Sequence, residues 1–326
     1  MPVGKLNPFN PASDDVDSWV GVLENYLLAN DIDKLDGTNA FHQVEIEKAS
    51  QKFLVINTHR GLYRYNVLPQ GIASSPAIFL ELMDHMLAGI PMSGSFVDDV
   101  ICSGKDNTQH LQTLRTIFQR MRKCNYRLSR DKCVFMQSLV KFLGHIVSHD
   151  GIRTDPAKVD AIMSMRRPKN VAEVKSFLGL VNFYAKFIPN LSHVCEPMNN
   201  LTRKDIPWLW SHKCQSAFDH IKVCIVSTPT LAHFQQSQVI GISCDASSVG
   251  LGVVLFHKYE DGSEQPIAYA CKTLSATEKN YSQIEKEGLA IIFGVKSFQQ
   301  FLFGRRFILV TDHNPLLAIF GPNREV

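Results

Sequence analysis

Residues 95–104 read SFVDDVICSG, two short apolar runs that flank the acidic pair Asp98–Asp99. Apolar and β-branched residues on both sides of the pair predict two short strands with the charges at the tight turn between them. Another pair, Asp14–Asp15, opens a polar helix start, so adjacent acidic residues carry no weight by themselves. What distinguishes Asp98–Asp99 is its place between buried strands, where crowded charges are costly unless a cation or a basic partner neutralises them.

A third carboxylate, Asp36, ends a short apolar strand in KLDGTNAFHQV, residues 34–44. Carboxylates that converge from separate strand ends suit two Mg²⁺ ions, because Mg²⁺ prefers oxygen ligands. Such a pair of ions activates an attacking hydroxyl and stabilises a leaving pyrophosphate in phosphoryl transfer. A structural salt-bridge cluster is the alternative for these three residues.

The length of 326 residues gives room for two or three domains and a sizeable buried core. Lys plus Arg number 34 and Asp plus Glu 31, a net charge of +3 that neither requires nor excludes a polyanionic partner. A hydrophobic fraction of 45% excludes a wholly disordered chain. No secretory signal and no run of about 18 apolar residues is visible.

The eight cysteines are scattered, and no Cys-x-x-Cys pair is present. This usage predicts reduced thiols in an intracellular protein. Two close pairs, His193/Cys195 and His212/Cys214, have the residue types of metal ligands, but ordinary core or surface roles are the favoured interpretation.

Periodicity predicts the elements of the first half of the chain. An acidic first turn followed by an apolar stripe predicts a helix over residues 14–29. The runs KFLVINT and GLYRYNVL predict a hairpin. Ser75 and Pro76 start a helix that Gly89 ends.

The second half of the chain shows a helical region followed by strands. Residues 156–228 carry helical signals almost throughout. Strand patterns return after Phe234 in VIGISCDAS, GLGVVLFHK and PIAYACK. A capping box of Ser275 and Glu278 then predicts one long helix through Phe303.

Several segments, in this order, resemble the reverse transcriptase of gypsy-type LTR retrotransposons: LDGTNAFHQV, GLYRYNVLPQGIASSPAIFLELMDHML, FVDDV and KCVFMQSLVKFLGHIVSHDGIRTDPAKV. The resemblance continues into the attached ribonuclease H domain through SFLGLVNFYAKFIPNLS, CDASSVGLGVVL, PIAYACKTLSATEKNYSQIEKEGLAII and TDHNPLLAI. It covers about residues 34–326, and the number of ordered segments makes it specific. It implies an α+β, multi-domain fold with a palm and partial fingers, a helical thumb, and a truncated ribonuclease H-like mixed-sheet domain.

The resemblance implies roles for the acidic residues of the first half. Asp36 and Asp98 are similar to the metal-binding aspartates of the polymerase, and the backbone carbonyl of Gly37 to a further ligand. Asp99 resembles the second member of the catalytic pair. The family usually has Tyr before that pair, and Phe96 keeps the ring but loses the hydroxyl.

The resemblance also implies residues that bind nucleotide and primer. Phe41 falls where an aromatic ring closes the nucleotide pocket against a ribose 2′-hydroxyl, with core packing on a strand as the alternative. Gln70 and Gly71 match the segment that contacts the incoming nucleotide and the template. Lys132 is a candidate phosphate contact or a solvated surface lysine. The primer-grip hairpin corresponds to Phe142, Leu143 and Gly144.

Three further acids resemble the first three acids of ribonuclease H. Asp245 follows the strand VIGISC, Glu287 lies on the predicted long helix, and Asp312 ends the strand FILVTD. In the family, such acids bind two metal ions that support hydrolysis of the RNA strand of an RNA:DNA hybrid. Glu285 is a nearby competitor, and Glu287 is preferred because its EGLAI context matches the family helix better.

The sequence departs from the family pattern at both ends. It stops at Val326, before the fourth acid and the last strand and helix of a ribonuclease H domain, and no fingers region with basic residues precedes Asp36. Instead, FNPASDDVDSWVGVLENYLLANDI resembles the start of a Gag-like capsid region, with an ordinary amphipathic helix as the alternative. The expected divisions are an N-terminal segment 1–33, a palm with partial fingers 34–150, a thumb and connection 151–235, and an incomplete ribonuclease H-like domain 236–326.

The resemblance implies RNA-directed DNA synthesis by a two-metal mechanism, with associated ribonuclease H activity. A catalytically inactive remnant that only binds nucleic acid is the alternative, and a capsid-type assembly role of residues 1–33 is a third hypothesis. The expected cofactors are two Mg²⁺ ions, or Mn²⁺, in each active site. The expected partners are a primed RNA or DNA template, an RNA:DNA hybrid and deoxynucleoside triphosphates, without a membrane. The expected location is intracellular, in the cytoplasm or the nucleus.

Overall fold

The computed structural model describes residues 32–204 and 206–320 and divides into two compact units. Unit 1 holds the chain up to residue 143 together with 147–149, and unit 2 holds 144–146 and the chain from 150 onward. The helix predicted over residues 14–29 and the Gag-like segment lie outside the described residues. The four domain ranges expected from the sequence stay predictions.

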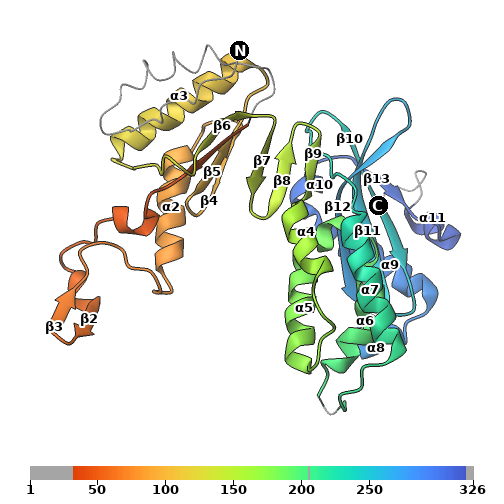
Figure 1. Ribbon diagram of the computed structural model, residues 1–326. Coiled ribbons are helices and arrows are strands. Elements are labelled where there is room, and N and C mark those ends of the chain that lie inside the picture. The colour runs from red at the N-terminus through yellow and green to blue at the C-terminus, as the bar shows by residue number, and fades with distance from the viewer. Residues whose placement is uncertain (1–31, 205, 321–326) are drawn as a thin grey trace. The chain divides into compact units, whose positions relative to one another are not determined.

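Unit 1 contains an antiparallel sheet of four strands in the order β4-β5-β1-β6. Its strands are β1 (Ile32–Asp36), β4 (Ser93–Phe96), β5 (Asp99–Cys102) and β6 (Val134–Gln137). The helices are α2 (Ser75–Leu87) and α3 (Asn107–Lys123), with short 3-10 turns η1 (Ala40–Gln43) and η2 (Gln51–Phe53). The predicted hairpin is present as β2 (Val55–Thr58) and β3 (Gly61–Arg64), which stand apart from the four-stranded sheet of this unit (Figure 1).

Local sequence signals explain where the helices of unit 1 begin. Pro76 occupies the first turn of α2, where its missing N–H costs no hydrogen bond. Asp106 caps α3, because its Oδ1 accepts a hydrogen bond from the N–H of Gln109 at 2.8 Å. Three basic residues in the last turn of α3 interact favourably with the negative end of the helix dipole.

The core of unit 1 lies between this sheet and the two helices. Helix α2 contacts β4, α3 contacts β5, and the helices contact each other. Leu35 and Val100 of the sheet, Phe79 of α2 and Phe118 of α3 are fully buried in one cluster. Each such side chain stabilises the fold by about 1.5–3 kcal/mol relative to exposure. The cluster therefore fixes the strands that carry the acidic residues against both helices.

A buried polar network connects four elements of unit 1 on the core side of β1. Asp33 is fully buried and lies opposite Cys102 in the β1–β5 register. Its Oδ2 lies 2.8 Å from His110 Nε2, and its Oδ1 accepts a hydrogen bond from the N–H of Met136 at 2.6 Å. Because a buried carboxylate without partners is costly, these contacts tie β1 to β5, α3 and β6.

A three-stranded sheet, β7-β8-β9, follows in the chain, and the division between the units runs through it. Its strands are β7 (Leu139–Phe142), β8 (His145–Ser148) and β9 (Gly151–Thr154). The stretch VKFLGHIVS, residues 140–148, thus belongs to two strands that are joined by a tight turn.

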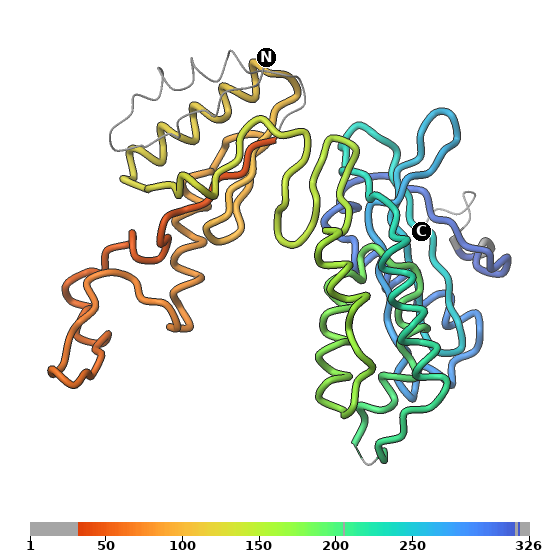
Figure 2. The backbone as a smooth tube through the Cα atoms, viewed as in Figure 1, coloured from red at the N-terminus to blue at the C-terminus, as the bar shows by residue number. Residues whose placement is uncertain are grey.

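Unit 2 continues with the predicted helical region. Its helices are α4 (Pro156–Met163), α5 (Val171–Phe183), η3 (Ala185–Phe187), α6 (Leu191–Leu201) and α7 (His212–Val226). Figure 2 shows these segments, drawn in green, running alongside one another. Their core contains the fully buried Phe177 of α5 and Phe218 of α7, whose ring centroids lie 4.7 Å apart. Aromatic pairs at this separation add about 0.5–1.5 kcal/mol beyond their buried area.

The second part of unit 2 is a mixed sheet in the order β12-β11-β10-β13. Its strands are β10 (Val239–Ala246), β11 (Gly250–Lys258), β12 (Glu264–Thr273) and β13 (Ile308–Val310). Strand β13 runs parallel to β10, whereas the other pairs are antiparallel. Ile242, Leu255 and Ala290 of α9 are fully buried in one cluster, which holds that helix on the sheet.

The prediction of one helix from Ser275 through Phe303 is wrong. Two capping boxes follow each other in this stretch, Ser275 with Glu278 and Ser282 with Glu285. Each box satisfies the free N–H groups of a helix start, so the second box begins a new helix. The observed elements are α8 (Ala276–Lys279), α9 (Gln283–Ser297), α10 (Gln299–Leu302) and, after β13, α11 (Asn314–Phe320).

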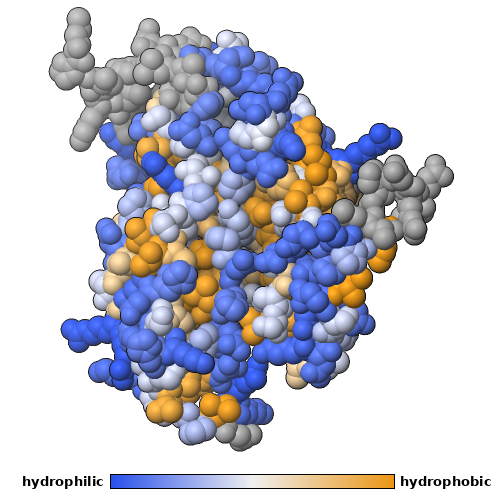
Figure 3. Space-filling model, turned by 90° about the vertical axis from the view of Figure 1, so that its right-hand side faces the viewer, coloured by the Kyte–Doolittle hydropathy of each residue, from blue (hydrophilic) through white to orange (hydrophobic). Residues whose placement is uncertain are grey.

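The surface mixes charged and apolar residues. Phe303 is 81% exposed and Phe53 76%. On the face drawn in Figure 3, hydrophilic side chains separate apolar patches. Within the described ranges, no helix combines the length and the apolar character needed to cross a membrane.

We predict that Asp33→Ala destabilises the protein by about 3 kcal/mol, because the substitution leaves His110 buried without its partner. Urea unfolding followed by circular dichroism measures the change. Asp84→Ala, an exposed position on α2, is the matched control and should change stability by less than about 0.5 kcal/mol. Equal unfolding midpoints for the two variants would contradict the structural role of Asp33.

Candidate active sites

The strand register brings the first group of predicted acids together. In the β1–β5 pair, Asp36 lies directly opposite Asp99. In the β4–β5 hairpin, Phe96 pairs with Asp99, which leaves Val97 and Asp98 as the two turn residues. Val97 has a φ of 54°, a conformation that costs a β-branched residue energy and that occurs mainly where the surrounding structure imposes it. The hairpin therefore holds Asp98 at the end of the sheet beside Asp36.

The backbone of Gly37 closes this end of the sheet. Its N–H donates a hydrogen bond to the carbonyl oxygen of Asp98 at 3.3 Å, so the segment after Asp36 touches the acidic turn. A side chain on Gly37 would overlap the Tyr126 hydroxyl, which is buried and has no hydrogen-bond partner in the described chain. Burial, followed by the charges of Asp98 and Asp36, raises the pKa of Tyr126 above its ordinary value. The Tyr126 side chain therefore stays a neutral phenol beside the segment that carries the acidic residues.

Two lysines neutralise part of the acidic charge. Lys34 Nζ lies 2.9 Å from Asp99 Oδ1, and Lys132 Nζ lies 3.2 Å from Asp36 Oδ1. Lys132 is thus placed against a predicted metal ligand, although 63% of its side chain is exposed. The structure turns Asp99 toward Lys34, and within the described residues the three acids do not form one ligand cluster.

The predicted nucleotide-binding residues lie on separate segments of unit 1. Phe41 belongs to the 3-10 turn η1 rather than to a strand, and its ring centroid lies 5.1 Å from that of Phe79. It is half-buried, so one part of the ring packs on the core while the rest remains accessible. Gln70 and Gly71 are exposed in the loop before α2. No described contact joins them to Phe41.

The predicted primer-grip residues form the tight turn between β7 and β8. Phe142 is the last residue of β7, and Leu143 and Gly144 have φ values of 48° and 73°. Positive φ at both central residues is typical of a two-residue hairpin turn. The structure therefore gives this segment the hairpin form that the resemblance implies.

The second group of predicted acids converges in unit 2. Asp245 lies near the end of β10, Glu287 lies on α9, and Asp312 follows β13. Each residue offers a carboxylate oxygen within 4.8 Å of the others. The parallel pairing of β10 with β13 places Asp245 and Asp312 at the same end of the sheet, and α9 packs on β10. Three carboxylates on three elements therefore meet at one point.

The electrostatics of Glu287 fit a cation at this point. Its side chain is only 4% exposed, and Oε1 accepts a hydrogen bond from Gln283 Nε2 at 2.6 Å. Its Oε2 is buried without a hydrogen-bond partner in the described chain. Burial raises the pKa of Glu287, the Gln283 hydrogen bond lowers it, and the charges of Asp245 and Asp312 raise it further. Hard carboxylate oxygens in this arrangement fit a divalent cation such as Mg²⁺ or Mn²⁺.

Glu285 has a different function in the same helix. Its Oε2 accepts hydrogen bonds from the N–H and the hydroxyl of Ser282, both at 2.8 Å, as the second half of the capping box. These hydrogen bonds lower its pKa. The structure thus brings Glu287, not Glu285, to Asp245 and Asp312.

Sequence reasoning did not find every polar residue near these centres. Asp33, Cys102 and His110 form a buried cluster with metal-ligand residue types. The hydrogen bonds of Asp33 to His110 and to the Met136 N–H already engage both carboxylate oxygens, which explains the cluster without a metal. The sequence did contain one signal for this cluster, because Asp33 is an acidic residue at an inward-facing position of the strand that ends at Asp36. The His193/Cys195 and His212/Cys214 pairs join no such cluster among the described residues.

Two family models match the chain. The model for reverse transcriptase (RNA-dependent DNA polymerase) matches residues 26–147, and the model for the RNase H-like domain found in reverse transcriptase matches residues 210–309. Curated relatives include the Tf2-3 and Tf2-7 transposon polyproteins of Schizosaccharomyces pombe, each 34% identical over 289 residues. The match covers 87% of this chain and 22% of each polyprotein, so the chain spans about a fifth of the length of these relatives.

Solved structures share the fold. The foamy viral protease-reverse transcriptase in complex with dsDNA has a TM-score of 0.78 at 22% identity, covering 100% of this chain and 67% of the viral chain. The same viral protein in complex with an RNA/DNA hybrid has a TM-score of 0.78 at 23% identity, covering 99% and 43% of the two chains. These likenesses confirm the α+β fold class predicted from the sequence.

The two family models define the class of the chain, which has a reverse transcriptase domain followed by an RNase H-like domain. Over 87% of its length, the chain is similar to retrotransposon polyproteins. The resemblance stated from the sequence is thereby confirmed. Domains of these two kinds generally depend on divalent metal ions.

We predict that Glu287→Gln raises the melting temperature of the chain in metal-free buffer near pH 7. The pKa of Glu287 is raised in the folded state, so folding favours the protonated form, and stability falls as pH rises through this pKa. A neutral amide of the same shape removes that cost. Differential scanning fluorimetry across pH 4–8 (roughly spanning ordinary carboxyl pKa values) measures the effect.

The matched control for this prediction is Glu285→Gln, which removes a hydrogen-bonded carboxylate with a lowered pKa. It should lower the melting temperature near neutral pH, because ionised Glu285 stabilises the start of α9. A melting temperature for Glu287→Gln at or below that of the parent near pH 7 would contradict the cost assigned to the buried, ionised Glu287.

Proposed function

We propose that the chain is an RNA-directed DNA polymerase with associated ribonuclease H activity. The observation that carries the proposal is the convergence of Asp245, Glu287 and Asp312 at one end of a mixed sheet, in a chain whose preceding unit matches a reverse transcriptase. Because the chain spans about a fifth of its polyprotein relatives, its own activity, substrates and partners belong to the proposal.

In the polymerase site, Asp36 and Asp98 would hold the divalent cations, with the Gly37 carbonyl as a further ligand. This assignment is supported by the position of Asp36 at the end of β1, beside the turn that carries Asp98. The hydrogen bond from the Gly37 N–H to the Asp98 carbonyl joins the two segments. In the nuclease site, Asp245, Glu287 and Asp312 would hold them. The chemistry supplied by bound Mg²⁺ or Mn²⁺ is activation of the attacking oxygen and stabilisation of the leaving oxygen in phosphoryl transfer.

The protein's own groups set the geometry of the polymerase site. Lys34 holds the Asp99 carboxylate on the face of the sheet that carries Asp36. The buried Tyr126 ring fills the space beside Gly37, so a side chain at that position would overlap it. Positioning contributes much of the rate of phosphoryl transfer, and these contacts supply it through rigid strands.

The residues around the polymerase acids would bind the substrates. We assign Phe41 to the nucleotide pocket, where a bulky ring beside the sugar excludes a ribose 2′-hydroxyl by steric contact. Gln70 and Gly71 would contact the nucleotide and the template, and the Leu143–Gly144 turn would contact the primer backbone. The exposure of Gln70 and Gly71, and the partial exposure of Phe41 and of the Leu143–Gly144 turn, support the assignment.

In the nuclease site, Gln283 orients Glu287. Its amide donates to Glu287 Oε1 at 2.6 Å and to the Ala246 carbonyl at 2.9 Å, which joins α9 to the end of β10. The other carboxylate oxygen is left free of hydrogen bonds among described groups and would face the cation. The RNA strand of an RNA:DNA hybrid is the proposed substrate of this site.

The proposed partners are a primed template, an RNA:DNA hybrid and deoxynucleoside triphosphates. Support for nucleic acid comes from the structural neighbours, in which the foamy viral enzyme is bound to dsDNA or to an RNA/DNA hybrid. We also propose an intracellular location, which rests on the family and accords with eight cysteines that form no disulfide.

We predict that Asp98→Asn lowers primer extension on poly(rA)/oligo(dT) with Mg²⁺ by about 100-fold or more, because the amide removes a charged oxygen ligand. Asp84→Asn, exposed on α2, is the matched control and should extend the primer like the parent. Extension by the Asp98 variant at the parental rate would contradict the assignment. No extension by a folded parent that still binds primer-template would favour an inactive polymerase instead.

We predict that Asp245→Asn abolishes cleavage of the RNA strand in a labelled RNA:DNA hybrid and leaves primer extension unchanged, because the two groups of acids lie in different units. Gel analysis of both reactions with one protein preparation measures this separation. Asp160→Asn, exposed on α4, should retain both activities. Continued hybrid cleavage by Asp245→Asn would overturn the nuclease assignment.

A further inference from the structure

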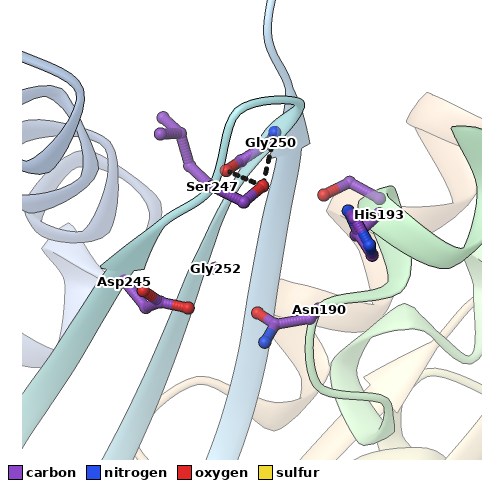
Figure 4. A pocket seen from close by; sticks show the side chains of 8 residues that line it. Asn190, His193, Asp245, Ser247, Gly250 and Gly252 are labelled. Atoms are coloured by element: carbon purple, nitrogen blue, oxygen red, sulfur yellow. Dashed lines mark hydrogen bonds between the residues drawn. The ribbon is translucent and has the colours of Figure 1, made fainter. Parts of the chain in front are cut away.

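A pocket of about 130 Å³ lies beside the nuclease acids in unit 2 (Figure 4). One wall is formed by the ends of β10 and β11, and the other by the start of α6. Asp245 lies at the pocket and thus belongs both to the acidic cluster and to this cavity. The polar side chains around it are Asn190, Ser192, His193, Asp245 and Ser247.

The register of the sheet explains how Asn190 reaches this position. Asp245 of β10 lies directly opposite Gly252 of β11. A Cβ atom on Gly252 would overlap the Oδ1 atom of Asn190, so the Asn190 carboxamide occupies the place of the missing side chain. Side chains of directly opposed residues point to the same face. The carboxamide therefore lies on the face of the sheet toward which Asp245 points, as Figure 4 shows.

A second glycine lets α6 approach β11 this closely. A Cβ atom on Gly250 would lie 2.6 Å from the hydroxyl oxygen of Ser192 and 3.0 Å from a backbone carbonyl of β12. Because Gly250 and Gly252 have no side chains, the first turn of α6 can pack directly against β11. The approach is a packing feature of the fold, and it fixes the position of the Asn190 backbone relative to Asp245.

The Asn190 side chain packs over Gly252 but forms no hydrogen bond there. Asn190 has a left-handed φ of 50° and stands at the N-cap of α6, yet its side chain does not cap the helix. The side-chain carboxamide makes no hydrogen bond to any group in the described part of the chain, whereas the Asn190 backbone carbonyl accepts one from the His193 N–H. By contrast, the Ser247 hydroxyl is fully engaged, since it donates to the Gly250 carbonyl and accepts from the Gly250 N–H, both at 3.0 Å. The Asn190 carboxamide is therefore available to a ligand at the pocket, next to Asp245.

We infer that the Asn190 carboxamide binds a ribose 2′-hydroxyl of the RNA strand beside Asp245 and thereby helps the nuclease site to select RNA over DNA. This inference rests on the proposed ribonuclease H function. A carboxamide offers one acceptor oxygen and donor N–H groups, and a 2′-hydroxyl is both a donor and an acceptor. A DNA strand at this place leaves the carboxamide without that partner, which costs affinity and rate.

The position of Asn190 in the chain makes this a contribution from outside the nuclease domain. Residues 210–309 match the RNase H-like family model, and Asn190 precedes them. The three carboxylates offer only acceptor oxygens, whereas the Asn190 carboxamide adds donor N–H groups that can pair with the oxygen of a 2′-hydroxyl. A helix of the preceding segment would thus complete the specificity of the site.

Asn190→Gly tests the inference, because glycine tolerates the left-handed φ and removes only the carboxamide. The substrates are a labelled RNA:DNA hybrid and a set of hybrids in which single ribonucleotides around one cleavage site are replaced by 2′-deoxynucleotides. For the parent, one replacement should slow cleavage by about tenfold. For Asn190→Gly, all-ribose cleavage should be slower by a similar factor, and that same replacement should have no further effect.

Gly252→Ala provides a second, independent variant. The added methyl group displaces the Asn190 carboxamide, which can move because it is the end of a flexible side chain. It should therefore reproduce the cleavage defect of Asn190→Gly and its loss of sensitivity to the 2′-deoxy replacement. The double variant Asn190→Gly/Gly252→Ala should be no slower than Asn190→Gly alone, because both substitutions remove one contact.

The controls separate failure of this inference from failure of the nuclease function. Asn125→Gly makes the same substitution at another exposed asparagine with a positive φ of 53° and should cleave like the parent. The melting temperature, measured by differential scanning fluorimetry, monitors folding of all variants. If hybrid cleavage is absent from the parent or survives Asp245→Asn, the nuclease function fails, and the inference fails with it. If Asp245→Asn is inactive but Asn190→Gly keeps the parental rate and the parental 2′-deoxy effect, the inference alone is wrong.

Discussion

The antiparallel pairing of β1 with β5 is the constraint on which the polymerase half of the chain depends. Because side chains alternate along a strand, Lys34, Asp36 and Asp99 share one face of this pair. Leu35 and Val100 share the other face and are fully buried. A slip of one residue would move the acids into the core and the apolar residues to the surface. The buried core and the acidic face therefore enforce the same register.

In the β10–β11 pair of unit 2, buried apolar residues and a site residue again alternate along the strands. Cys244 and Val253 lie opposite each other on the face that α9 covers, where Gly294 permits close packing. Their neighbours Asp245 and Gly252 lie on the other face, at the start of α6. Each site thus uses a register fixed by buried apolar residues to place a carboxylate near a strand end. Rigid strands hold such groups more accurately than loops do.

The sequence predicted the elements and the acidic residues better than their polar surroundings. Apolar periodicity and caps found α2, and local context selected Glu287 over Glu285, because both signals are short-range. Repeated capping boxes were missed, so one helix was predicted where three exist. The Lys34–Asp99 ion pair depends on strand register, and Asn190 meets Gly252 from 62 residues away, counting along the chain from 190 to 252. Such contacts have no local pattern that a single sequence displays.

The two groups of acids differ in how their charge is balanced, and the difference has a physical consequence. Asp36 and Asp99 each have a lysine at 3.2 and 2.9 Å, so the polymerase acids are partly neutralised by the protein itself. In the described part of unit 2, no lysine or arginine pairs with Asp245, Glu287 or Asp312, and one oxygen of buried Glu287 has no partner. Uncompensated carboxylates repel one another, and a divalent cation relieves that repulsion when it binds. A cation would therefore relieve more repulsion at the proposed nuclease site, whereas at the proposed polymerase site it would compete with Lys132 for Asp36.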